Sequence, residues 1–278
     1  MFRRVGLVLV VLWALAVVPV ASAAYPAPFA AQGGEGVLSI DGSLRFVALG
    51  AGESTVISAT KTSDGSAWKS QSVAGSFGIP MLTQAGPGGG MFRDGGTFVL
   101  QSTGFFATTQ FMLISTQDLA ARDSIALKGT FAFDALSPDG SRLYLIQHTS
   151  SQDIEHYIVR AYDLNAHKLL PGRIADKTQK SWVMQGWPVS RTTSADGRWA
   201  YTLYANPGGM PFSHALDTVR GVAHCIGIPW PATQPNQGPV FNFSLVLGPQ
   251  GKTLAVKYQG GMTYRFVNTT TWKVSKHR

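Results

Sequence analysis

A short turn built on Asp-Gly recurs along this chain at nearly regular intervals, and each turn precedes a run of apolar and β-branched residues. The turn glycines are 53, 45, 57 and 54 residues apart. A period of this size is typical of repeat proteins, in which each unit buries its apolar face only by stacking on its neighbours. The turns are Asp41-Gly42, Asp94-Gly95, Asp139-Gly140, Asp196-Gly197 and, with glutamine in place of aspartate, Gln250-Gly251.

The third and fifth repeats show what one unit contains. In the third, strand-like runs at 143–146, 157–163 and 168–170 are separated by turn residues, and the fifth has matching runs at 253–256 and 262–267. Together with the apolar run before each turn, this pattern predicts four short antiparallel strands per repeat. Because one thin sheet cannot exclude water by itself, the copies are expected to pack radially. The sequence therefore predicts an all-β fold, a β-propeller of about five four-stranded blades.

The two ends of the repeat region bear on how such a ring closes. The run at 36–40 is expected to be the first strand of the first blade, and residues 273–275 are expected to end the last blade, so the propeller domain covers 36–278. No strand is then exchanged between the termini, and closure depends on packing between blades alone. An open or irregular propeller is the alternative.

The third repeat also carries a family resemblance. Its turn Ser137-Pro138-Asp139-Gly140 is followed by Arg142-Leu143-Tyr144 and later by Tyr162-Asp163-Leu164. This arrangement resembles the exported bacterial β-propeller repeats of the TolB-like and YVTN kinds, which read SPDG-x-x-LY and then V-x-x-x-D in each blade. The match is best over residues 130–275 and weaker over 36–130. The resemblance implies a propeller fold far more than any particular function.

The N-terminus has the layout of a secretory signal. Arg3 and Arg4 precede sixteen uncharged residues, and small residues at Ala21 and Ala23 fit a signal peptidase site. We predict a signal peptide over 1–23, a linker over 24–35 and an extracytoplasmic location, either secreted or associated with the cell envelope. An uncleaved anchor is the alternative, although the apolar run is shorter than the roughly 20 residues that span a bilayer.

Charge and cysteine content restrict the possible partners and chemistry. The formal net charge is +8, which becomes +6 without the two signal arginines, and no Lys/Arg tract is present. A nucleic-acid partner is not expected, because such binding needs a basic patch with stacking aromatics that the sequence does not display. Cys225 is the only cysteine, so no intrachain disulfide can form. We expect its thiol to be buried and inert.

The longer irregular segments are predicted to share one end of the propeller. In a four-stranded meander, the loops between second and third strands and the links between blades lie on one face, here called the top face, and the Asp-Gly turns lie on the bottom face. Loops that exceed the needs of a hairpin are often functional. Their aromatic and imidazole groups suit ligand binding, although these tryptophans could instead fill gaps between blades. The predicted ligand-binding residues are His148, His156, Trp182, Trp187, His214 and Trp230.

Support for catalysis is sparse. The sequence contains three glutamates, and Asp153 with Glu155 is the one plausible carboxylate pair. No nucleophile elbow, zinc motif or paired-cysteine site occurs. The turn aspartates are expected to cap their own turns, with a repeated cation site as the alternative. We therefore expect neither a catalytic residue nor a metal site.

These observations favour an exported, monomeric, non-enzymatic propeller that binds a protein or cell-envelope component through its top-face loops. We expect no cofactor, no nucleic-acid partner and no integral membrane domain once the signal is cleaved. The competing hypothesis is a propeller hydrolase acting on glycosides or lactones, which would use Asp153, Glu155 and the top-face histidines, with a bound divalent ion.

Overall fold

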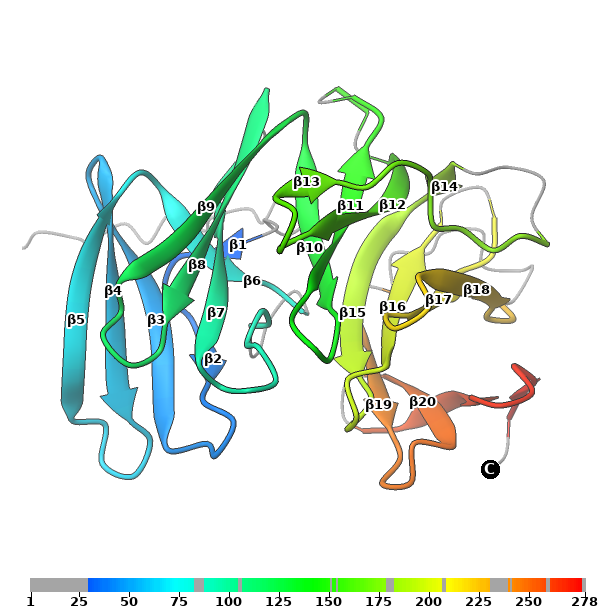
Figure 1. The fold of residues 1–278 in the computed structure, drawn as a ribbon. Helices are drawn as coiled ribbons and strands as arrows, with labels where there is room; N and C mark the ends of the chain where they lie inside the picture. Colours follow the sequence, from blue (N-terminus) through cyan, green and yellow to red (C-terminus); the bar gives the residue numbers. More distant parts are fainter. Residues whose placement is uncertain are drawn as a thin grey trace, which may run out of the picture.

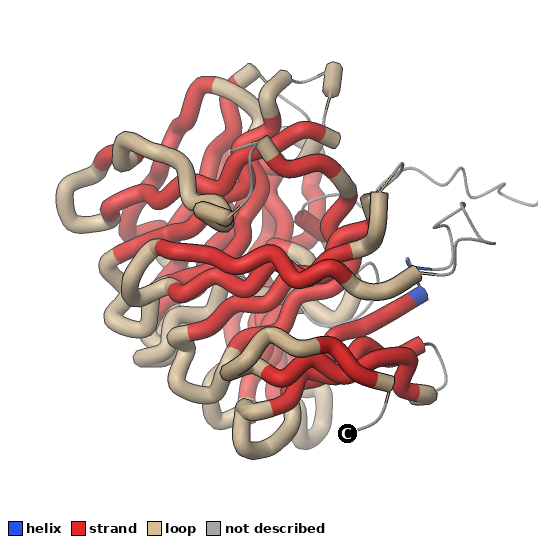
Figure 2. Tube along the Cα trace, turned by 90° about the vertical axis from the view of Figure 1, so that its right-hand side faces the viewer, coloured by secondary structure: helices blue, strands red, loops and turns tan. Residues whose placement is uncertain are grey.

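The computed structural model describes residues 30–82, 88–104, 107–150, 152–153, 155–178, 183–206, 209–230, 240, 242–258 and 261–276. Over these residues the chain forms 22 strands in five antiparallel sheets, joined by loops (Figure 2). None of the helical segments in this part of the chain is long and apolar enough to cross a membrane. The predicted all-β propeller fold is confirmed.

Each sheet is one blade, and the blades follow one another along the chain (Figure 1). Blade 1 contains β2 (Val37–Leu38), β3 (Leu44–Ala51), β4 (Ser54–Lys61) and β5 (Ala67–Ala74). Blade 2 contains β1 (Ala30–Ala31), β6 (Phe77–Pro80), β7 (Thr97–Ser102), β8 (Thr108–Ser115) and β9 (Ala121–Lys128). Blade 3 contains β10 (Phe131–Leu136), β11 (Arg142–His148), β12 (His156–Asp163), β13 (Lys168–Leu169) and β14 (Met184–Gln185). Blade 4 contains β15 (Trp187–Thr193), β16 (Trp199–Ala205), β17 (Phe212–Asp217) and β18 (Val222–Gly227). Blade 5 contains β19 (Phe243–Leu247), β20 (Thr253–Tyr258), β21 (Thr263–Asn268) and β22 (Val274–Ser275).

The recurring turns are held by a hydrogen-bond pattern that is written into the local sequence. In blade 3, the Ser137 hydroxyl donates to Asp139 at 2.6 Å and accepts from the Arg142 backbone N–H at 2.9 Å. Blades 1 and 4 repeat this pattern with Ser39 and Ser194. In four blades a threonine at or just past the end of the third strand also donates to the carbonyl of the turn glycine, the donors being Thr62, Thr116, Thr218 and Thr269. The turn carboxylates thus act as local caps.

These capped turns predict how stability depends on pH. The hydrogen bond from Ser39 lowers the pKa of Asp41 from 3.8 to about 2, and those from Ser137 and Ser194 lower the pKa values of Asp139 and Asp196. A lowered folded-state pKa gives stability that is complete above the unfolded value and is lost as pH falls through the folded value. We therefore expect the urea midpoint of unfolding to fall as the pH drops from 3.8 toward about 2.

Two triple variants test whether the capped turns cause this loss of stability at low pH. Replacing the three turn serines with alanine should reduce the acid limb, that is, the fall of the urea midpoint at low pH, because the carboxylate pKa values move back toward normal. Replacing three serines on the strands of blade 1, Ser58, Ser70 and Ser72, should leave the limb unchanged. Identical acid limbs in the two triple variants would contradict the role of the turns.

The apolar core is divided into four clusters in the part of the chain that the structure describes, and each lies between consecutive blades. Blades 1 and 2 meet through Phe46 and Phe98, whose ring centroids are 4.9 Å apart. Blades 3 and 4 meet through Tyr157 and Tyr204, also at 4.9 Å. The other two clusters join blade 2 to blade 3 and blade 4 to blade 5. Stacking of neighbouring sheets is therefore what buries their apolar faces.

The ring is open between blades 5 and 1. No core cluster of described residues joins these two blades, and they lie at opposite ends of the arc in Figure 1. On the face of blade 1 that points away from blade 2, Leu38 and Leu49 remain 40% and 43% exposed. On the corresponding face of blade 5, Val246 is 41% exposed. Of the two forms that the sequence allows, the structure takes the open one.

The centre of the arc of blades, here called the hub, contains chain segments that are not part of the repeat pattern. Ala30 and Ala31, within the predicted linker, form β1 and pair with Ile79 and Pro80 of β6. The chain that follows β6 then reaches blade 4, where the Arg191 backbone N–H donates to the Leu82 carbonyl at 2.6 Å. These contacts tie blade 2 to blade 4 across the centre of the arc.

Candidate functional site

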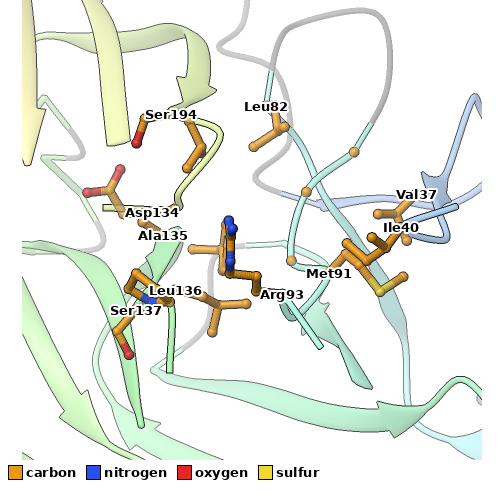
Figure 3. A pocket seen from close by; sticks show the side chains of 17 residues that line it. Val37, Ile40, Leu82, Met91, Arg93, Asp134, Ala135, Leu136, Ser137 and Ser194 are labelled. Atoms are coloured by element: carbon orange, nitrogen blue, oxygen red, sulfur yellow. The ribbon is translucent and has the colours of Figure 1, made fainter. Parts of the chain in front are cut away.

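A cavity of about 290 Å³ lies in the hub, on the side of the Asp-Gly turns. Four blades contribute to its walls, and Figure 3 shows Arg93 between Val37 and Ile40 on one side and the labelled residues of blades 3 and 4 on the other. The Arg93 guanidinium donates to the Ala195 carbonyl of the blade 4 turn. The walls are mostly apolar, and Asp134 is the one carboxylate among the described lining residues.

Asp134 is placed by an irregularity in its strand. The register between β10 and β11 shifts between Phe133 and Ala135, which leaves Asp134 as the extra residue of a β-bulge. Its carboxylate accepts from the Thr202 hydroxyl at 3.2 Å and lies 3.5 Å from Nε of Arg191. Arg191 in turn donates from Nη1 to the Met81 carbonyl at 2.7 Å. Asp134 is 3% exposed, so this ion pair sits inside the protein and joins blades 2, 3 and 4.

Buried aromatic and imidazole groups continue this polar cluster between blades 3 and 4. Burial raises the pKa values of the Tyr157 and Tyr204 hydroxyls and lowers the pKa of the His214 imidazole. Each group is therefore held in its neutral form. Burial also raises the pKa of the Cys225 thiol to about 12, so the thiolate needed for nucleophilic attack is scarce at neutral pH. The cluster is suited to holding two blades together.

A second group of polar and aromatic side chains lies on the top face of blades 3 and 4. The His156 imidazole Nδ1 lies 2.7 Å from Oδ2 of Asp153, and this hydrogen bond lowers the pKa of Asp153. The Trp187 indole N–H donates to Glu155 at 3.2 Å. The Gly186 backbone N–H donates to the Glu155 carbonyl at 2.9 Å, which fixes the link between the blades. An acidic loop and an aromatic ring are thus held beside each other.

An apolar pocket of about 290 Å³ opens near this group. It is lined by Met184 of β14, Phe212 of β17 and Cys225 of β18, with Met210 at its rim. Met210 is 56% exposed, so a large apolar side chain faces solvent at this pocket. Exposed methionine beside a pocket is typical of adaptable binding surfaces.

The structure separates the six residues that the sequence singles out. His148 and His214 lie on β11 and β17 and are buried, so they face the interior. His156 and Trp187 take part in the top-face group just described. Trp230 packs edge-on against Phe243 and Tyr264 of blade 5, with centroids 6.1 and 5.9 Å away. Trp182 lies outside the described residues. Whether any of the six binds a ligand stays a prediction.

Sequence reasoning did not single out the methionines around the pocket or the aromatic residues of blade 5. Met210 lies in the irregular segment between β16 and β17, where a large apolar side chain is a usable signal of a surface contact, whereas Met184 lies on β14 and is buried. The described residues contain no group of three His, Cys, Asp or Glu side chains placed to hold a metal ion.

Comparison with known proteins places this geometry among β-propellers. No family model matches the sequence, and no curated protein is similar to it. Hydrazine synthase of Kuenenia stuttgartiensis matches with a TM-score of 0.53 at 15% identity, over 90% of this chain and 66% of that one. The β-propeller domain of Cps50 (Swd1) from Myceliophteria thermophila matches with a TM-score of 0.51 at 12% identity, over 88% of this chain and 69% of that one. TolB from Acinetobacter baumannii gives 0.46 at 14% identity, over 80% and 48%.

The two stronger matches show the fold alone, because proteins of very different activity share it at this level of identity. This chain spans just under two thirds of the hydrazine synthase chain and about half of the TolB chain. It is a β-propeller scaffold that covers part of the length of the propeller proteins it resembles.

Proposed function

We propose that this protein is an exported binding propeller that recognises a protein or cell-envelope component through the top face of blades 3 and 4. The observation that carries the proposal is the top-face group of Glu155, His156 and Trp187 near the pocket at Met210. Aromatic and apolar surface with fixed polar groups around it is what a binding site requires. The proposal of export rests on the signal-like residues 1–23.

The state of the loop carboxylates favours binding over hydrolysis. A glycoside hydrolase needs two carboxyl groups facing each other across a bond, roughly 5 to 9 Å apart. Here Asp153 is engaged by His156, and Glu155 is engaged by Trp187. In the hub, the carboxylate of Asp134 is paired with Arg191. Each of these three carboxylates is already hydrogen-bonded to, or paired with, another side chain of the protein.

Binding to fractionated cell-envelope extract and to a glycan array tests the proposal. We expect Trp187→Ala and Met210→Ala each to weaken capture of the same component by about tenfold, since exposed aromatic and apolar anchors contribute most to recognition. Trp68→Ala is the matched control, because Trp68 is also partly exposed but lies on β5 of blade 1. Equal loss in all three variants, or none, would count against this surface.

The hydrolase alternative has its own readout. Turnover of chromogenic glycosides or lactones by the wild-type protein, abolished in both Asp153→Asn and Glu155→Gln, would replace the binding proposal. Binding of an envelope component by the wild-type protein, without turnover of any of these substrates, would support it.

A further inference from the structure

Blade 5 differs from the rest of the propeller in its charge. Residues 218–278 contain seven lysines and arginines and no aspartate or glutamate, so every carboxylate side chain of the protein precedes Val219. Five of the seven lie on or next to the strands of blade 5, namely Lys252, Lys257, Arg265, Lys273 and Lys276, and Arg220 lies in the last turn of blade 4. A surface that carries lysine and arginine side chains and no carboxylates attracts anions.

A pocket of about 420 Å³ lies at the top of this blade. Its walls are the rings of Phe243, Tyr258 and Tyr264 together with Met262, and its charged lining residues are Arg265 and Lys276. Tyr258 is 38% exposed and Met262 is 70% exposed, so large apolar side chains here face solvent. The pocket therefore combines an apolar interior with a cationic rim.

The pocket walls are fixed in place by contacts within the blade. The Tyr264 hydroxyl donates to the Pro229 carbonyl at 2.8 Å, and Phe243 lies edge-on to Tyr258 and Tyr264 with centroids 5.2 and 5.3 Å away. The Arg265 guanidinium lies 3.9 Å from the centre of the Tyr264 ring and donates to the Tyr264 carbonyl at 2.7 Å. A site built in advance loses little entropy when a ligand binds.

The donor set decides the chemistry of the occupant. Arg265 and Lys276 donate hydrogen bonds and carry positive charge, which suits carboxylate. A neutral sugar would be matched by a mixture of donors and acceptors, whereas the charged side chains of this pocket are donors only and its side-chain acceptors are the hydroxyl oxygens of Thr263, Tyr258 and Tyr264. The aromatic and thioether walls suit one large apolar group, such as a phenylalanine or leucine side chain.

We propose that the blade 5 pocket binds an acidic polypeptide segment, with an apolar side chain in the pocket and neighbouring carboxylates on Arg265 and Lys276. The inference rests on the proposed binding function and adds a partner chemistry at a second place on the same face. Trp230 supports the pocket from behind by packing on Phe243 and Tyr264.

Fluorescence anisotropy with a labelled peptide of aspartates and glutamates around one phenylalanine tests the proposal on the full-length protein. We expect saturable binding that Arg265→Gln with Lys276→Gln weakens roughly fivefold to tenfold. Tyr258→Ala should weaken it about fivefold through the lost ring contact. Exposed lysines on other blades give the matched control, Lys128→Gln with Lys168→Gln, which should leave binding unchanged.

Further probes separate this site from general charge attraction. The same peptide with alanine in place of phenylalanine should bind about fivefold more weakly. Equal affinity for the two peptides, equal effects of the two double variants, or binding of polygalacturonate without binding of the peptide would each overturn the proposal. Thermal melts show whether each variant folds. If the Arg265→Gln, Lys276→Gln double variant fails to fold, peptide binding by Tyr258→Ala is compared with binding by the wild-type protein. Loss of envelope binding in the Trp187 and Met210 variants with intact peptide binding would leave this inference standing.

Discussion

Replacing Arg191 with methionine is expected to lower the free energy of unfolding by about 3 to 5 kcal/mol. The guanidinium lies beside the buried carboxylate of Asp134 and donates to the Met81 carbonyl. Methionine fills a similar volume but leaves a charge inside the protein without its partner. Urea unfolding followed by tryptophan fluorescence measures the change. The effect is large because three blades meet at this pair.

Two further variants test whether the unpaired buried charge causes the loss of stability in Arg191→Met. Arg122→Met removes an ion pair with Asp118 at 2.5 Å on the surface, where both side chains are about half exposed, and should change stability little. Adding Asp134→Asn to Arg191→Met should restore part of the lost stability, because the unpaired charge is then removed. A double variant less stable than Arg191→Met would show that the ion pair is not the source of the effect.

Replacing Gly140 with valine is expected to lower the free energy of unfolding by about 2 to 4 kcal/mol. The glycine has a φ of 69°, which β-branched residues rarely adopt, and a Cβ there would lie 3.0 Å from Cδ1 of Phe92. Backbone strain and a clash with the neighbouring blade therefore add. Thermal melts should show a clear loss, whereas Asp153→Ala on the exposed top loop should melt close to wild type.

Gly251 provides the matched control for this substitution. It occupies the equivalent turn of blade 5 with a φ of 68°, and no atom lies within 4 Å of the Cβ position. Gly251→Val should therefore lose only the backbone contribution, about 1 to 2 kcal/mol. Equal melting points for Gly140→Val and Asp153→Ala would contradict the repeat assignment on which the fold rests.

The repeat assignment itself could be made from the sequence because its physics is local. The Ser137, Asp139 and Arg142 contacts span five residues, and in four blades the threonine just past the third strand meets its turn glycine about twenty residues away. Alternating apolar residues between such turns leave few options other than short paired strands. The strand pattern and the capping role of the turn aspartates followed from these short-range rules.

The candidate sites were harder to predict, because a loop assignment does not determine which way a side chain points. His148 and His214 flank irregular segments, yet both fall on strands and turn inward. Glu155 and Trp187 are 32 residues apart and meet only because β14 pairs with β12. The blade 5 pocket needs Phe243 and Tyr264 from different strands, so no single segment displays it.

The amino-acid sequence alone determined five units, the four-stranded meander in each and the turns that join its strands, because hydrogen bonds and side-chain alternation within about fifty residues specify each unit. The fifth strands of blades 2 and 3, β1 and β14, lie outside this pattern. Tertiary structure alone decided that the ring stays open, that Arg191 reaches Met81 across 110 residues, and that Arg265 and Lys276 meet the aromatic rings of blade 5 at one pocket. Those features depend on the angle between stacked sheets and on what fills the hub. The packing of whole faces sets that angle, and no local pattern encodes it.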